Sequence, residues 1–165
     1  MAAANEYHSI TSWRVRASAE EVFEIISRPE EFPRWWPDVY LNVIDLVPGD
    51  KHGAGRRLRF HTKGWLPYTL DWESTCTEVD RPRRLAIAAS GDFVGRGIWT
   101  FEQDRDDVSM TFDWRLSAEK PLLRYMSFLL KPIFSANHRW AMARGRESLE
   151  RELARRREQP HLIHG

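Results

Sequence analysis

Two adjacent polar residues, Asn137 and His138, stand in the last third of the chain among apolar and small residues. The 3.6-residue period of this region predicts a helix, and neighbours in a helix lie on adjoining sides, so at least one of the pair faces the body of the protein. A histidine there can act as a general base or donate a hydrogen bond to a ligand oxygen. The alternative is a structural pair that bonds to a strand or caps a kink at Pro132, because buried polar groups find partners.

Three carboxylates form a second set of groups that could move protons. Asp71 and Glu73 lie two residues apart in a stretch of alternating pattern, so they share one face of a predicted strand, and Asp113 lies on another strand. Residues in such positions more often form the solvent face of a sheet. Asp71 and Glu73 are therefore candidate catalytic residues only if their face lines a cavity.

The buried face of that strand, Tyr68–Val79, is left open by the sequence. One face carries Asp71, Glu73, Thr75, Thr77 and Val79, and the other carries Leu70, Trp72, Ser74 and Cys76. A bulge in so long a strand would exchange the two faces midway.

Other kinds of site chemistry lack the residues they need. Cys76 is the only cysteine, which excludes an intramolecular disulfide and thiolate zinc sites, and no histidine is identifiable beside it to activate a nucleophile. The six histidines include no HExxH motif and no i,i+4 pair. The glycines of Gly91–Gly97 do not open a helix, which argues against a phosphate-binding loop. We therefore expect no metal and no cofactor.

Eight tryptophans are far more than an average chain of 165 residues contains. They predict large, rigid aromatic walls, which either fill a core or stack on a flat ligand. We expect some of them to line a pocket together with residues of the long helix. The predicted ligand-binding residues are Trp13, Trp36, Trp99, Phe101, Phe112, Trp114, Met126, Phe134, Asn137, His138 and Ala141.

The elements that position these residues follow from the hydrophobic period. A first strand over Tyr7–Val15 precedes a helix opened by the capping box Ser18–Glu21, and a second box at Ser27–Glu30 predicts a second short helix. From Tyr40 the period is two, as in strands. The predicted strands are Tyr40–Val47, Arg56–Thr62, Tyr68–Val79, Arg84–Ser90, Arg96–Gln103 and Val108–Leu116.

The chain ends in a long predicted helix with a small-sided inner face. Ala141, Gly145 and Ser148 on that face would let the helix approach a sheet closely, while the arginine-rich tail indicates a solvated face. Pro132 predicts a kink or a fresh helix start. The preceding run Leu122–Leu130 is apolar on nearly every side, so we expect a lid over one end of a cavity. A homodimer interface and a membrane contact are the alternatives.

A curled sheet around this helix is the simplest way to bury both apolar surfaces. We expect an α+β fold with a seven-stranded antiparallel sheet, two short helices between the first and second strands, and the long C-terminal helix. One face of the last strand should meet that helix, and its residues are Val108, Met110, Phe112, Trp114 and Leu116. Because inward residues mix large aromatic rings with small and polar groups, a cavity is expected.

Length and charge exclude several classes of protein. The 165 residues fit one domain, 1–165, with flexible ends expected at 1–5 and 158–165. A net charge of +1 provides no field that would attract nucleic acid. The N-terminus has neither the basic nor the apolar region of a signal peptide, and the longest apolar run is too short to span a bilayer. We therefore expect a cytoplasmic protein with no stable membrane insertion and no nucleic-acid partner.

Five short motifs follow one another along nearly the whole chain: Ala17–Phe23, Arg34–Pro37, Thr77–Pro82, Gly97–Phe101, and Asn137–Met142 with Gly145. In this order and spacing they resemble the helix-grip superfamily of START-type lipid-transfer domains, birch-pollen-allergen-like proteins and polyketide cyclase/dehydrase-like proteins (SRPBCC). The resemblance implies a helix-grip fold with a deep pocket for lipids, sterols, polyketides or hormones, catalytic in some members and not in others. It fixes no catalytic residue.

These observations lead to three hypotheses on function. The first is a protein that binds a hydrophobic or aromatic small molecule. The second is an enzyme of the aromatase/cyclase or dehydratase kind, which needs at least two titratable groups that converge in the cavity. The third is peripheral lipid exchange at a membrane surface, based on the apolar run Leu122–Leu130 and its flanking cations.

Overall fold

The computed structural model describes residues 6–118 and 121–158, with side chains described at 6–117 and 132–158. Its order of elements is the predicted one of strand, short helices, six strands and long helix. The elements are β1 (Glu6–Arg16), α1 (Ala19–Ile26), the 3₁₀ turn η1 (Pro29–Glu31), α2 (Phe32–Trp35), β2 (Tyr40–Val47), β3 (Arg57–Lys63), β4 (Thr69–Asp80), β5 (Arg84–Gly91), β6 (Phe93–Asp104), β7 (Asp107–Ala118) and α3 (Pro121–Glu158).

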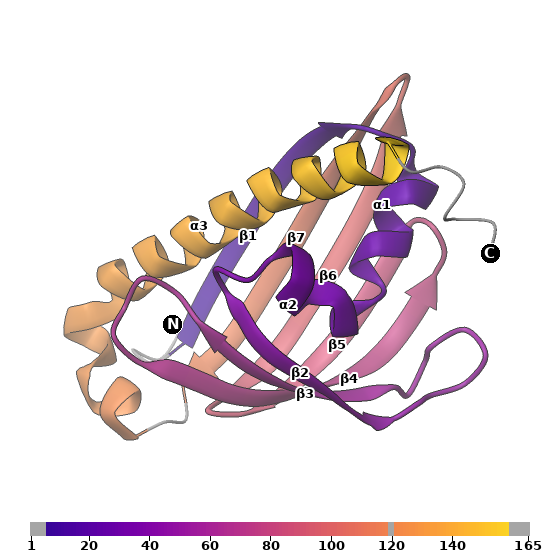
Figure 1. Cartoon of the computed structure of the whole chain (residues 1–165). Helices are drawn as coiled ribbons and strands as arrows, with labels where there is room; N and C mark the ends of the chain where they lie inside the picture. Colours follow the sequence, from indigo (N-terminus) through magenta and orange to yellow (C-terminus); the bar gives the residue numbers. More distant parts are fainter. Residues whose placement is uncertain (1–5, 119–120, 159–165) are drawn as a thin grey trace.

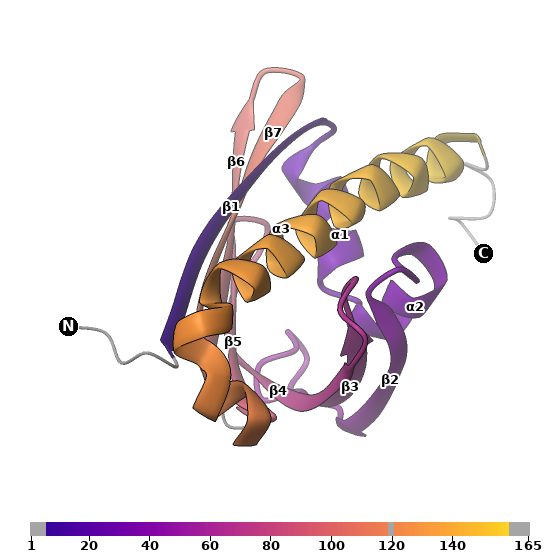
Figure 2. The same cartoon turned by 90° about the vertical axis from the view of Figure 1, so that its left-hand side faces the viewer.

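The seven strands form one antiparallel sheet in the order β1-β7-β6-β5-β4-β3-β2. Each strand from β2 to β7 pairs with its neighbour in the chain, as short connections require, and β1 closes the row beside β7. Figures 1 and 2 show that the sheet is strongly curled, with α3 lying inside the curve between β1 on one side and β2 and β3 on the other. The predicted helix-grip arrangement of an α+β fold is therefore confirmed.

The concave face of the sheet carries the core. On β7, Val108 and Met110 are fully buried, Phe112 and Trp114 are buried, and Leu116 is half-buried. The alternate residues of this strand face the opposite side, as the period of two requires. The predicted inward face of the last strand is the face that α3 covers.

A bulge decides which face of β4 is buried. Trp72 and Ser74 are buried on the concave side, and the β4–β5 register shifts between Cys76 and Glu78. Beyond the shift, Val79 packs against the core. The two faces of the strand thus exchange at the bulge. The face of Trp72 and Ser74 is buried before it, and the face of Val79 is turned to the core after it.

The helices after β1 begin differently from the prediction. The first capping box forms, since Ser18 accepts the amide hydrogen of Glu21 and the Glu21 carboxylate accepts that of Ser18. The second does not: Ser27 is the C-cap of α1, its hydroxyl donates to the Glu24 carbonyl at 3.3 Å, and the 3₁₀ turn η1 opens with Pro29 instead. A proline in the first turn needs no amide partner, so the turn forms without a side-chain cap.

The long helix α3 is continuous through Pro132, so no fresh helix starts there. Figures 1 and 2 show instead that its first turns run in another direction from the rest, a bend that an internal proline explains. Within residues 6–118 and 121–158, no helix has the length and apolarity that a membrane crossing requires. The side chains of Leu122–Leu130 lie outside the described residues.

A glycine sets the distance between α3 and α2. Gly145 is buried against the indole of Trp36, and a Cβ added at Gly145 would lie 2.3 Å from Trp36 Cζ2 and 2.6 Å from Cε2. No side chain fits at that separation. The helix face predicted to carry small residues therefore packs against an aromatic ring.

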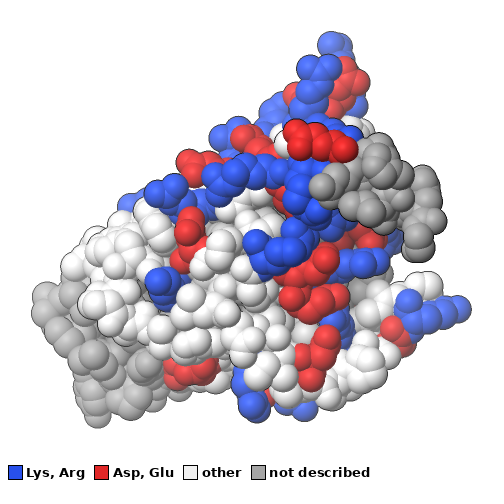
Figure 3. Space-filling model, viewed as in Figure 1, with Lys and Arg blue, Asp and Glu red and all other residues white. Residues whose placement is uncertain are grey.

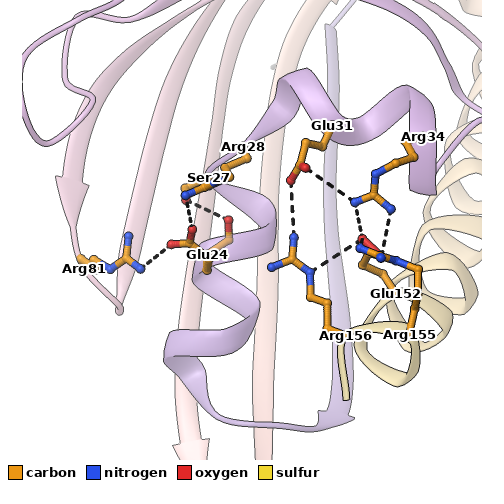
Figure 4. A network of polar contacts seen from close by, with 9 residues as sticks. All are labelled: Glu24, Ser27, Arg28, Glu31, Arg34, Arg81, Glu152, Arg155 and Arg156. Carbon is orange, nitrogen blue, oxygen red and sulfur yellow. Dashed lines mark hydrogen bonds and ion pairs between the residues drawn. The ribbon is translucent and has the colours of Figure 1, made fainter. Parts of the chain in front are cut away.

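A buried carboxylate fastens the C-terminal half of α3. The Glu152 side chain is 1% exposed and accepts both hydrogen bonds of the Arg34 guanidinium from α2, together with a bond from Arg155 at 2.6 Å (Figure 4). Burial alone would raise the pKa of Glu152, but the bonds from Arg34 and Arg155 outweigh it and lower the pKa to about 2. Arg156 also reaches Glu31 at 3.4 Å. The arginine-rich tail, predicted as a solvated face, is largely engaged in ion pairs.

Candidate functional site

A cavity of about 230 Å³ lies between the concave face of the sheet, the residues around α2, and α3. Its lining is dominated by aromatic and aliphatic side chains from nearly every element of the fold. On the face shown in Figure 3, charged side chains gather over the C-terminal half of α3 and the neighbouring α1 and α2. The part of that face nearer the start of α3 is mostly uncharged.

The floor of the cavity is built from two stacks of aromatic rings on neighbouring strands. Phe60 stacks on Trp72 with ring centroids 4.4 Å apart, and Phe112 stacks on Trp99 at 4.5 Å and on Trp114 at 5.3 Å. The two stacks meet at Trp72 and Trp114, whose rings are tilted by 58°. Gly97 makes room for two of these rings, because a Cβ there would lie 2.8 Å from both Phe112 and Trp114. The cavity therefore has a rigid aromatic wall.

Most of the predicted ligand-binding residues line this cavity. They are Trp36, Trp99, Phe112, Trp114, Phe134, Asn137, His138 and Ala141. Trp13 and Phe101 instead lie in the core behind the wall: Trp13 contacts the rings of Trp36 and Trp99, and Phe101 packs on Phe23. The side chain of Met126 lies outside the described residues.

His138 is held as a neutral imidazole. Its Nε2 is buried and has no hydrogen-bond partner among the described residues. Burial is the main reason that its pKa falls to about 4, and the neighbouring Arg139 lowers it further. At neutral pH this histidine can therefore accept or donate one hydrogen bond without carrying charge.

Asn137 binds a loop of the protein. Its Oδ1 accepts the backbone N–H of Trp65 at 2.8 Å and that of Leu66 at 3.4 Å, which holds the β3–β4 loop (residues 64–68) against α3. A Cβ at Gly64 would lie 2.0 Å from the same oxygen, so the glycine permits the contact. We name this contact the Asn137 latch. Because Asn137 bonds to backbone amides of the protein itself, its role here is the structural one of the two alternatives.

Three tyrosines in the lining were not among the predicted site residues. Tyr7 and Tyr68 both place their rings against Phe134, with centroids 6.0 and 6.3 Å away. Burial, together with the nearby Tyr7, raises the pKa of Tyr68 to about 12, and burial also raises the pKa of Tyr40. For Tyr68, the alternation with Leu70 and Trp72 could have indicated a place in the lining. That signal could be used only if the buried face of β4 was known.

The carboxylate candidates lie on the convex face, away from the cavity. Asp71 pairs with His61 at 2.7 Å, and Glu73 pairs with Arg59 and Arg57, which hold its pKa below the usual range. Asp113 pairs with His8 on the same face. The structure thus does not bring any of these carboxylates together with Asn137 and His138. Among the described residues, no group of three or more metal-ligating side chains converges.

Solved structures with this fold include proteins of several activities. The aromatase/cyclase Zhui from Streptomyces sp. R1128 aligns with a TM-score of 0.70 at 17% identity, covering 92% of this chain and 95% of its own. A START superfamily protein from Mycobacterium smegmatis aligns at 0.68 and 16%, covering 90% and 97%. Norcoclaurine synthase from Thalictrum flavum aligns at 0.62 and 12%, covering 90% and 87%. At these identities the likeness concerns the fold alone.

No curated protein sequence matches the chain. A family model does match, over residues 8–155, which include most of β1, all of β2 to β7 and most of α3. Membership of this family implies a pocket for hydrophobic ligands. The chain belongs to the polyketide cyclase/dehydrase and lipid transport family.

Proposed function

We propose that the protein binds a hydrophobic or aromatic small molecule, of the lipid or polyketide class, in the cavity between the sheet and α3. The observation that carries the proposal is the aromatic wall, made of the Phe60–Trp72 stack and the Trp99–Phe112–Trp114 stack, that lines a cavity of about 230 Å³. A space lined in this way is typical of small-molecule sites, which combine apolar walls with a few polar groups. Its volume favours a compact ligand over a long chain.

Tryptophan fluorescence tests this proposal directly, because several indoles line the space. The protein is titrated with fatty alcohols, fatty acids, sterols and polycyclic aromatics, and saturable quenching or a spectral shift by at least one of them is expected. Native mass spectrometry of protein purified from its own host should then show a retained small molecule. Absence of saturable binding across the whole panel would contradict the proposal.

A pair of variants on one helix shows where the ligand binds. Ala141 lines the cavity and is 9% exposed, whereas Ala143, two residues on, is exposed. Ala141→Phe fills the space and should abolish binding, and Ala143→Phe adds the same ring outside it and should leave binding intact. Equal affinities of the two variants would place the ligand elsewhere.

Catalysis is the second candidate, and His138 is the observation that favours it. A neutral imidazole whose Nε2 has no partner among the described residues can take a proton from a bound substrate. The other titratable groups in the described lining are tyrosines and Lys63, so the described residues provide no carboxylate partner for this base. We would test it by incubating the protein with a linear poly-β-ketone and following ring closure or loss of water, with His138→Gln as the variant that should lose turnover. Lipid exchange at a membrane depends on Leu122–Leu130 and stays a prediction.

A further inference from the structure

The described lining of the cavity contains no carboxylate and no arginine. Its only cation is Lys63, the last residue of β3, and Lys63 is exposed while its neighbour Thr62 is buried. Successive side chains of a strand point to opposite faces, so the exposed ammonium does not compensate a charge inside the cavity. A ligand placed against the aromatic wall therefore meets neutral groups.

Several of these neutral polar groups already have partners. Thr62 accepts the indole N–H of Trp72 at 3.2 Å, and Asn137 accepts the amides of the β3–β4 loop. His138 has none: its Nε2 is buried and has no hydrogen-bond partner among the described residues. Buried polar atoms without a partner are rare in native proteins, and they call for one.

An uncharged oxygen or amide on a ligand would supply a partner for His138. The neutral imidazole can donate or accept, so a carbonyl, hydroxyl or amide fits it. A carboxylate would also offer acceptor oxygens, but its negative charge would be buried without a counter-ion in the described lining, and burial of an unpaired charge is strongly unfavourable.

Resting on the proposed function, we propose that the natural ligand is a neutral molecule bearing a carbonyl, hydroxyl or amide, and that the cavity rejects carboxylates of the same skeleton. The polar group follows from the buried, unpartnered nitrogen of His138 in the lining. The neutrality follows from the uncharged lining. The class includes cyclised aromatic ketones and phenols, and it excludes free fatty acids.

Calorimetric titration with 2-naphthamide and 2-naphthoate separates shape from charge, because the two probes have nearly the same shape and differ by one negative charge. We expect the amide to bind at least roughly 100-fold more tightly at pH 7. Naphthoate that binds as tightly as the amide would overturn this inference and leave the proposed function standing. If neither naphthalene probe binds, the amide and the carboxylate of a panel ligand that does bind are compared in the same way, and equal affinities there overturn the inference.

The unpartnered imidazole nitrogen is tested with a variant of His138 and a control outside the cavity. His138→Phe should weaken 2-naphthamide about 2- to 10-fold relative to naphthalene, the range expected for one hydrogen bond. Trp35 also has a buried nitrogen without a partner among the described residues but does not line the cavity, so Trp35→Phe should leave that ratio unchanged. If His138→Phe does not change the ratio, its imidazole does not bind the ligand oxygen.

Discussion

Asn137 of α3 accepts the backbone N–H of Trp65, 72 residues away in the chain, at 2.8 Å. The bond joins the long helix to the loop between β3 and β4, and both border the cavity. A contact of this kind controls how often the loop leaves the helix. It therefore connects the stability of the loop to the rate at which a ligand enters and leaves.

Removal of the Asn137 latch should loosen the loop without unfolding the protein. Asn137→Ala removes the acceptor of two backbone amides, so we expect a loss of about 1 kcal/mol in the free energy of unfolding and faster hydrogen exchange at Trp65 and Leu66. Ligand dissociation should accelerate as well. Asn137→Asp keeps the acceptor oxygen and is the control, in which the Trp65 amide should remain protected. Unchanged exchange in Asn137→Ala would show that the latch does not hold the loop.

The close contact of Gly145 with Trp36 gives a prediction opposite to helix propensity. Alanine is favoured over glycine in a helix by about 1 kcal/mol, yet Gly145→Ala should destabilise the protein by about 1–3 kcal/mol, because its Cβ would overlap the indole at 2.3 Å. Urea unfolding measures the change.

A second substitution tests the cause of that loss. In a Trp36→Phe background the smaller ring leaves room at Gly145, so Gly145→Ala should become nearly neutral or stabilising there. If alanine stabilises the protein in the presence of Trp36 as well, the helix does not need the glycine for its approach.

How far the sequence predicts this molecule depends on the range of the interactions. Alternation along β7 and the period of α3 reflect local burial, so the strands, the antiparallel sheet and most of the aromatic lining could be predicted. The bulge at Cys76 could be raised only as a possibility, because a register shift depends on the partner strand β5. A structural role for Asn137 was one of two alternatives, but its partners could not be predicted, since they lie in a distant loop.

The same limit explains the one buried carboxylate on α3. In the helical period, Glu152 stands beside Leu149 and Leu153 and is buried with them, although the arginine-rich tail that follows it was predicted as a solvated face. What permits its burial is Arg34, which comes from a helix 118 residues earlier in the chain. No pattern within α3 contains that information, because a buried charge is tolerated only where its partner reaches it.

Trp114 should be a main contributor to stability as well as a wall of the cavity. It is 9% exposed and contacts the rings of Trp72, Phe93 and Phe112. Trp114→Ala should cost about 3–5 kcal/mol in urea unfolding, the range for a large aromatic residue in a core. Trp65 is 49% exposed and provides the control, since Trp65→Ala should cost well below about 1 kcal/mol. A similar small loss for Trp114→Ala would mean that its ring does not belong to the core.

Glu152 should make the stability of the protein depend on pH in the acid range. The carboxylate has a folded-state pKa of about 2, below the value of about 4.3 expected in the unfolded chain. Its contribution is therefore fully present above about pH 4.5 and is lost as the pH falls toward 2, since the unfolded state then binds the proton first. The integrated effect is on the order of 3 kcal/mol.

Urea unfolding of Glu152→Gln between pH 2 and pH 7 measures this contribution. The variant should be less stable than the natural chain at neutral pH, and the difference should shrink as the pH falls, because a protonated glutamate and a glutamine both lack the charge that Arg34 and Arg155 stabilise. Glu150→Gln is the matched control on the same helix. The Glu150 side chain is 52% exposed and pairs with Arg146 at 3.5 Å, and an exposed pair contributes little. A pH-independent difference for Glu152→Gln would show that the carboxylate acts through packing and not through its charge.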